Sequence, residues 1–151
     1  MRKLLMLIMM LAISIMAAAQ NKQDIEKTRT DILANKKQIV KATLDLNKQE
    51  ADVFWPLYEE YQNALRLVHD RSSRLIANYL MDYKTLTDDQ AEVLIREVLN
   101  IEREQLNLKE TYVKKFSAVL PPKKVARYFQ LENKMQTVLD YDLAKKIPIV
   151  R

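Results

Sequence analysis

Apolar side chains recur at alternating spacings of three and four residues along two long stretches of the chain. The first stretch spans 51–79 and the second spans 91–119. This spacing keeps one face of an α-helix apolar over many turns, as in a heptad repeat. It predicts two long helices, over 47–81 and 87–119, each about 50 Å in length.

Capping residues mark where these helices begin. Thr87 and Gln90 form the pattern of a capping box, in which each side chain binds the backbone N–H of the other residue. Asn47 and Glu50 repeat the same device before the first long helix. A third start is indicated at Pro122, because proline suits the first turn of a helix, where its missing N–H has no partner to lose. A leucine leads into each start, namely Leu46, Leu86 and Leu120.

Two shorter helices are predicted over 23–42 and 122–143 from their apolar positions. Pro56 lies well inside the first long helix, where it removes a hydrogen bond and predicts a kink. With no glycine and four prolines, the chain also lacks the residues that turn the strands of a large sheet. The predicted fold is therefore all-α: an elongated, bent hairpin of two long helices with two shorter flanking helices.

The first residues have the composition of a targeting segment rather than of a folded element. Two basic residues precede an almost unbroken apolar run over 4–16, and three alanines follow it. This is the anatomy of a secretory signal peptide that is cleaved after Ala19. An uncleaved membrane anchor is the alternative, but the apolar run is shorter than the ~20 residues that cross a bilayer. We expect a signal peptide at 1–19, a single domain over 20–151, a periplasmic location and no stable membrane span after cleavage.

The composition excludes most classes of enzyme and metal protein. The 151 residues include no glycine, no cysteine and a single histidine, His69. Phosphate-binding loops, dinucleotide turns and nucleophile elbows need glycine, and thiolate chemistry needs cysteine. No catalytic residue, cofactor or metal is therefore expected. The net charge of +5 is modest, and nucleic acid is an improbable partner for an exported protein.

The second long helix carries an additional apolar row beside its heptad positions. The members of this row are Ile95, Leu99, Leu106, Val113, Phe116 and Leu120. A helix that is apolar on two adjacent flanks must contact two neighbours or leave one flank available. A thin layer of four helices also buries little of its own surface, so we expect a homodimer along this helix.

These features resemble the Spy/CpxP family of LTXXQ-motif periplasmic proteins. The segment Leu-Thr-Asp-Asp-Gln at 86–90 matches the motif outright, and Leu-Asn-Lys-Gln-Glu at 46–50 is a degraded copy. At the third start, Lys124 stands where family members carry Gln. The Phe-Trp-Pro-Leu-Tyr run at 54–58 also looks like a segment of small exported proteins of this broad group. The resemblance implies a cradle-shaped antiparallel dimer of bent helices.

The resemblance also implies a function as an ATP-independent chaperone of unfolded envelope proteins. Such a chaperone needs exposed apolar side chains among charges, so that clients are captured by weak hydrophobic contact and electrostatic attraction. Candidate residues for client or partner binding are Trp55, Arg66, Arg71, Arg74, Leu99, Leu106, Val113, Lys114 and Lys115. The purely structural alternative places the apolar row in the core or in a dimer interface, and the charges on a solvated face.

Two further hypotheses belong to the same family resemblance. A regulatory accessory would dock on the periplasmic domain of a sensor kinase or of an anti-sigma system, and it needs nearly the same surface. A metal sensor is less favoured, because beyond residue 19 the chain offers only His69, Met81 and Met135 as soft or borderline ligands. The sequence leaves open whether the apolar segment at 147–150 is disordered or docks on a neighbour, and its hydrophobicity favours docking.

Overall fold

The computed structural model describes residue 32 and residues 34–150 of the chain. Its elements are a helix over 34–44, α2 (Lys48–Asp82), α3 (Asp88–Ser117) and α4 (Pro122–Ala144). This part of the chain contains no strand, so the predicted all-α fold is confirmed. None of its helices has an apolar stretch long enough to cross a membrane. The expected signal peptide at 1–19 and the first part of the helix predicted over 23–42 lie outside the described residues.

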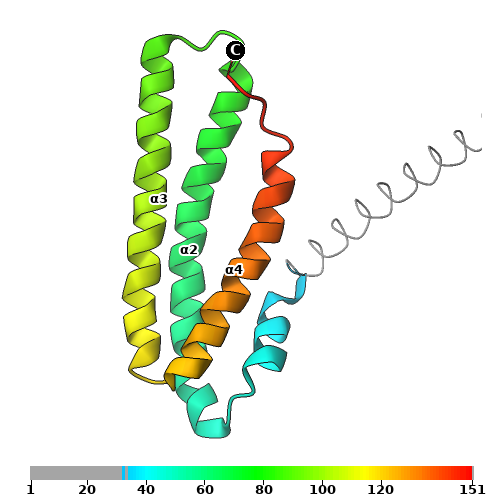
Figure 1. Ribbon diagram of the computed structural model, residues 1–151, viewed down its shortest axis with the longest axis vertical. Coiled ribbons are helices and arrows are strands. Elements are labelled where there is room, and N and C mark those ends of the chain that lie inside the picture. The colour runs from blue at the N-terminus through cyan, green and yellow to red at the C-terminus, as the bar shows by residue number, and fades with distance from the viewer. Residues whose placement is uncertain (1–31, 33, 151) are drawn as a thin grey trace, which may run out of the picture.

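The two long helices, α2 and α3, form an antiparallel hairpin (Figure 1). The helix α4 packs against this hairpin, and the helix 34–44 lies at the end where α3 turns into α4 (Figure 1). After α4, the segment 147–150 returns toward the α2–α3 turn at the opposite end (Figure 1). The helix α2 continues through Pro56, and the bend expected there stays a prediction.

Both predicted capping boxes are present at the starts of the long helices. At α2, the Asn47 side chain accepts a hydrogen bond from the Glu50 N–H, and the Glu50 carboxylate accepts one from the Asn47 N–H, both at 2.9 Å. At α3, Thr87 Oγ1 accepts from the Gln90 N–H at 3.3 Å, and Gln90 Oε1 accepts from the Thr87 N–H at 2.9 Å. Each box pairs N–H groups that the start of a helix leaves without partners, and a cap of this kind stabilises a helix by about 1 kcal/mol.

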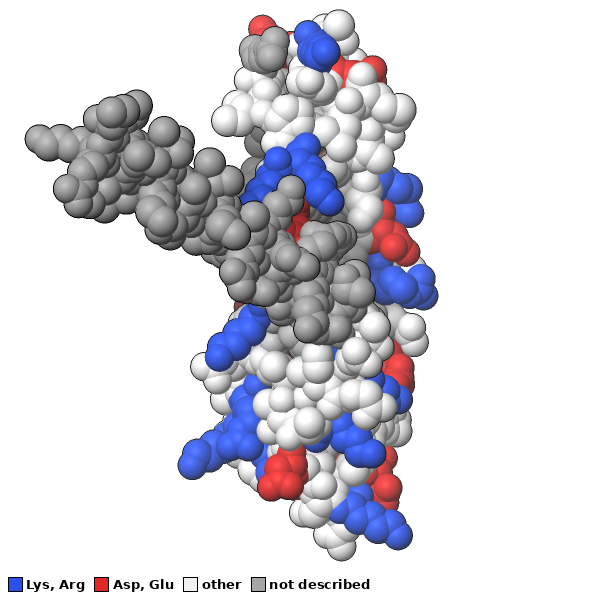
Figure 2. Space-filling view, turned by 90° about the vertical axis from the view of Figure 1, so that its right-hand side faces the viewer, with Lys and Arg blue, Asp and Glu red and all other residues white. Residues whose placement is uncertain are grey.

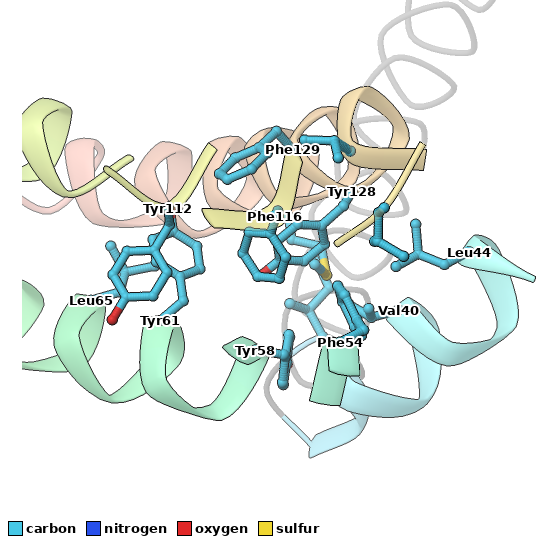
Figure 3. Close-up of a cluster of buried hydrophobic side chains, with 14 residues drawn as sticks. Val40, Leu44, Phe54, Tyr58, Tyr61, Leu65, Tyr112, Phe116, Tyr128 and Phe129 are labelled. Carbon is cyan, nitrogen blue, oxygen red and sulfur yellow. The ribbon is translucent and has the colours of Figure 1, made fainter. Parts of the chain in front are cut away.

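The core gathers at the end of the bundle where α3 turns into α4 (Figure 3). Most of the aromatic side chains meet there, and the rings of Phe54, Tyr61, Phe116 and Tyr128 are almost fully buried. The Phe116 ring lies 5.3 Å from that of Phe54 and 5.0 Å from that of Tyr128, so that α2, α3 and α4 meet at one point. Aromatic pairs at this separation add about 0.5–1.5 kcal/mol each beyond the burial of their area.

A polar cluster holds the helix 34–44 on α2 and α4. Lys36 forms an ion pair with Glu132 and donates a hydrogen bond to Gln62 Oε1 at 2.8 Å. The amide of Gln62 in turn donates to the Tyr128 hydroxyl oxygen at 3.1 Å. Only 4% of the Glu132 side chain is exposed, so Lys36 compensates a charge that water cannot reach. Burial, and to a lesser degree the Glu132 charge, raise the pKa of Tyr128, which keeps the phenol neutral.

Candidate functional site

The apolar row on α3 divides into a buried part and an exposed part. Phe116 and Leu120 are 0% and 4% exposed, because both belong to the core on which α4 packs. The rest of the row is uncovered, with exposed fractions of 61% for Ile95, 51% for Leu99, 55% for Leu106 and 37% for Val113. These four residues are called the α3 row below. The structural alternative that buries the row within the chain is therefore wrong for these four positions.

The α3 row borders a polar groove between α3 and α4. This groove has a volume of ≈ 420 Å³, and Leu106 lines it together with polar side chains of both helices. One of these polar side chains, Lys109, donates a hydrogen bond to Asn133 Oδ1 of α4 at 2.9 Å. Because the α4 side chains that line this groove are polar, the groove offers Leu106 no apolar partner on α4.

Two of the basic residues expected to face clients are instead bound within the chain. The Arg71 guanidinium lies 2.6 Å from Glu97 and 2.7 Å from Glu104, which connects α2 to α3. The hydrogen bond to Glu97 is the main reason why the pKa of Arg71 is raised. Lys115 Nζ lies 2.6 Å from Glu60 and makes a second link between the same two helices. Arg71 and Lys115 therefore contribute first to the fold.

The other basic candidates are accessible. Arg74 and Lys114 are exposed, and Arg66 is exposed with a loose ion pair to Asp70 at 3.6 Å. Lys114 directly follows Val113 of the α3 row. Figure 2 shows the side of the molecule on which α4 and the helix 34–44 lie, where Lys and Arg side chains are interspersed with acidic side chains and uncharged surface. Arg66, Arg74 and Lys114 therefore remain candidates for partner binding by their exposure alone.

Trp55 is half-buried at the margin of the aromatic core. Its ring lies 5.0 Å from that of Phe54 and 5.4 Å from that of Tyr58, and both contacts are edge-on. Lys37 places its ammonium 5.3 Å from the centre of the Trp55 ring. Trp55 is therefore largely engaged by its own chain, and only part of its surface is available to a partner.

The motif residues act as helix starts. The side chains of Asn47, Glu50, Thr87 and Gln90 are used in the two capping boxes. Leu46 is half-buried against the core, and Leu86 is half-buried near the α2–α3 turn. Their positions give the motif a structural role.

A second hollow, which the sequence hypotheses did not include, lies between α2 and α3 near their turn. It has a volume of ≈ 490 Å³ and mainly aliphatic walls, and the segment 147–150 lines it. The Tyr79 hydroxyl donates a hydrogen bond to the Pro148 carbonyl at 2.7 Å. The expected docking of this segment is therefore confirmed. In the sequence, Tyr79 could have indicated this hollow, because a tyrosine at the end of an aliphatic seam needs a partner for its hydroxyl.

His69 lies outside any cluster of metal-binding side chains. Within the described part of the chain, no group of three or more His, Cys, Asp or Glu residues could hold a metal ion. The imidazole is half-buried and its Nε2 lies 3.4 Å from the amide nitrogen of Gln105. Burial lowers the pKa of His69, and the nearby charge of Lys36 lowers it further. The ring is accordingly neutral at neutral pH.

Comparison of the chain with protein-family models, with curated proteins and with solved structures found no match. The likeness to the Spy/CpxP family accordingly rests on the motif residues and the order of helices described above.

Proposed function

We propose that this chain is a periplasmic, ATP-independent chaperone-like protein of the Spy/CpxP type, which binds unfolded or stressed envelope proteins. The α3 row carries this proposal. Its four aliphatic side chains lie on one helix and are between 37% and 61% exposed. Exposed aliphatic side chains that recur along one helix face support a role in contact with other proteins.

The α3 row favours weak and reversible binding. Full burial of one Leu, Ile or Val side chain contributes about 1.5–3 kcal/mol, and much of this gain offsets the entropy lost on association. The accessible cations Arg66, Arg74 and Lys114 would attract acidic segments of a client over longer distances, which increases the rate of encounter. A surface of this kind holds an unfolded chain without requiring a particular sequence.

Suppression of aggregation tests the proposal directly. The chain without residues 1–19 is added, at stoichiometric ratios and without ATP, to a chemically denatured model enzyme that is diluted into buffer. We expect light scattering to fall, and we expect the double variant Leu99→Gln/Leu106→Gln to lose most of this effect. Leu67→Gln is the matched control, because Leu67 is a 63% exposed leucine on α2, outside the α3 row. No suppression by the unmodified chain would end the proposal.

A regulatory accessory is the second candidate function, and the spacing of the α3 row favours it. Positions 95, 99, 106 and 113 fall on one heptad seam, which also suits a single helical partner. Affinity capture from envelope extracts separates the two functions. One stoichiometric membrane partner, such as a sensor kinase or an anti-sigma protein, would favour regulation, whereas many unfolded proteins would favour chaperone activity.

Export is a separate part of the proposal. We expect the protein recovered from the periplasm to begin at Gln20, the residue after the expected cleavage site. Intact mass and N-terminal sequencing of the recovered protein measure this. A protein that keeps its first 19 residues and fractionates with membranes would support the anchor alternative instead.

A further inference from the structure

The hollow between α2 and α3 has the shape and chemistry of a groove for an extended peptide. Three side chains of α2 and three of α3 form its aliphatic and aromatic walls: Leu75, Ile76, Tyr79, Leu94, Val98 and Ile101. Ser72, Glu102 and Gln105 supply its polar part. The segment 147–150 follows the last turn after α4 and lies here without regular secondary structure (Figure 1).

The segment 147–150 does not fill the groove. Ile149 is 89% exposed and Val150 is 48% exposed, although both are aliphatic and line the hollow. The wall residue Val98 also remains 39% exposed. The volume of ≈ 490 Å³ lies within the range of about 300–1,000 Å³ that is usual for ligand-binding pockets. The groove therefore has unused apolar surface even with this segment in place.

The contacts of the segment indicate what kind of ligand the groove recognises. The Tyr79 hydroxyl donates to the main-chain carbonyl of Pro148, and a hydrogen bond of this kind depends on no particular side chain. The walls select aliphatic side chains by burial alone, at about 25 cal/mol for each Å² removed from water. Together they suit an extended, uncharged stretch of aliphatic residues, such as an unfolded protein exposes.

We propose that this groove binds an extended aliphatic segment of an unfolded protein, and that residues 147–150 are a resident competitor which such a segment displaces. The inference rests on the proposed function, because it names the part of a client that is bound and where. Displacement exposes little more of Ile149, which is 89% exposed in the docked state, but it uncovers the half-buried Ile147 and breaks the hydrogen bond between Tyr79 and Pro148. Since the segment is tethered directly to α4, it competes at an effective concentration of about 1 mM or more. Residues 147–150 therefore prevent weakly binding client segments from occupying the groove, whereas segments with more apolar side chains displace them.

Removal of the competitor is the first test. A chain that ends at Lys146 is compared with the full-length chain in binding a fluorescent peptide with the sequence of residues 145–150, followed by anisotropy. We expect the shortened chain to bind this peptide about tenfold more tightly than the full-length chain, because the intramolecular competitor is gone. A peptide with serine in place of Ile147, Ile149 and Val150 should bind neither chain. Equal affinity of the two chains, or equal binding of the serine peptide, would overturn the inference.

A wall variant locates the binding site. In the shortened chain, Val98→Asp places a charge in the groove and should abolish peptide binding. Leu67→Asp is its matched control, because Leu67 is an exposed leucine of α2 that lies outside both the groove and the α3 row. Circular dichroism verifies that both variants remain helical. If both variants bound the peptide equally well, the groove would not be the site.

The row variants and the groove variants keep this inference separate from the proposed function. Loss of aggregation suppression in Leu99→Gln/Leu106→Gln, with peptide binding unaffected by truncation and by Val98→Asp, would leave the chaperone proposal standing without the groove. Peptide binding that follows the groove variants, in a protein that suppresses no aggregation, would retain the groove and remove the chaperone.

Discussion

Lys124 Nζ lies 2.6 Å from Oε2 of Glu50, and this ion pair joins the first turn of α4 to the capping box of α2. Lys124 also donates a hydrogen bond to the Asp45 carbonyl at 2.9 Å. Asp45 has a positive φ of 48°, a conformation that Asp adopts more readily than most residues, and it ends the helix 34–44. The residue that departs from the family motif therefore connects three helix ends.

The first prediction concerns the pH dependence of this contact. The hydrogen bond from Lys124, and then that from the Asn47 N–H, hold the pKa of Glu50 below its ordinary value of 4.5. The carboxylate therefore stabilises the fold fully above pH 4.5, and this contribution disappears as the pH falls through the lowered pKa. Glu50→Gln, which retains a capping side chain but removes the charge, should unfold at lower urea than the unmodified chain at pH 7. The difference should approach zero once the pH has fallen below the lowered pKa of Glu50, where both side chains are neutral.

Urea midpoints across this pH range measure the effect. Glu110→Gln is the control, because Glu110 is an exposed glutamate on α3 and should not change the midpoint at either pH. Lys124→Gln restores the residue of the family motif, and it should also reduce the pH dependence. A difference between Glu50→Gln and the unmodified chain that stays constant from neutral to acid pH would contradict the role of the charge.

The helix starts were predictable because each depends on residues close together in the sequence. A capping box needs two side chains three residues apart, and α2 and α3 begin at Lys48 and Asp88, next to the expected caps. The partner of Lys124 could not be predicted in this way. Glu50 and Lys124 are 74 residues apart, and only the packing of α4 beside the start of α2 brings them together.

The second prediction distinguishes the two parts of the apolar row on α3. Phe116 is 0% exposed, and Phe116→Ala should reduce the free energy of unfolding by about 3–5 kcal/mol, because it leaves a cavity among the rings of three helices. Val113 lies one turn earlier and is 37% exposed, so Val113→Ala should change stability by no more than about 0.5 kcal/mol. Urea denaturation of both variants checks this. Equal losses would mean that Val113 is buried in solution.

The sequence could not predict which residues of that row are buried and which are exposed, and the reason is physical. The spacing is the same at Leu106 and at Phe116, and the pattern predicts only that both lie on one flank of the helix. The path of α4 decides which of them is covered, and that path depends on the aromatic packing around Tyr128.

The polar cluster of Lys36, Gln62 and Glu132 was indicated only weakly by the sequence. Glu132 falls between Tyr128 and Met135 on the apolar face of α4, where a carboxylate needs a partner.

The third prediction compares two adjacent lysines in the helix 34–44. Lys36 compensates the buried carboxylate of Glu132, whereas Lys37 pairs with Glu59 at the surface, with both side chains more than half exposed. Lys36→Met should therefore cost about 3 kcal/mol of stability, since it leaves a buried charge without its cation. Lys37→Met should cost no more than about 1 kcal/mol, as is typical of exposed ion pairs. Thermal or urea unfolding of the two variants measures the difference, and equal costs would mean that Glu132 is hydrated.

The fourth prediction concerns self-association through the α3 row. The start of α3 is acidic, with Asp88, Asp89 and Glu92, and its last turn is basic, with Lys114 and Lys115. Two copies of α3 that pack antiparallel would place each acidic end beside the basic end of the other, whereas a parallel pair would oppose like charges. In an antiparallel pair centred near position 104, Ile95 would lie across from Val113 of the second copy, and Glu102 would lie near Lys109 of that copy. The charges therefore favour the antiparallel arrangement, whereas of the row only Ile95 and Val113 would pair with each other in this register, because Leu99 would lie across from Lys109 and Leu106 across from Glu102.

In the absence of clients, light scattering should give the mass of a dimer. A carboxylate in the middle of the row, Leu106→Glu, should give a monomer, while Leu67→Glu on α2 should remain a dimer because Leu67 lies outside the row. Raising the salt concentration to about 0.5 M should weaken the dimer, since the attraction between the helix ends is screened. Unfolded client should also compete with the second copy, because both would bind the same aliphatic side chains. A monomeric mass for the unmodified chain at every concentration would contradict self-association through the α3 row.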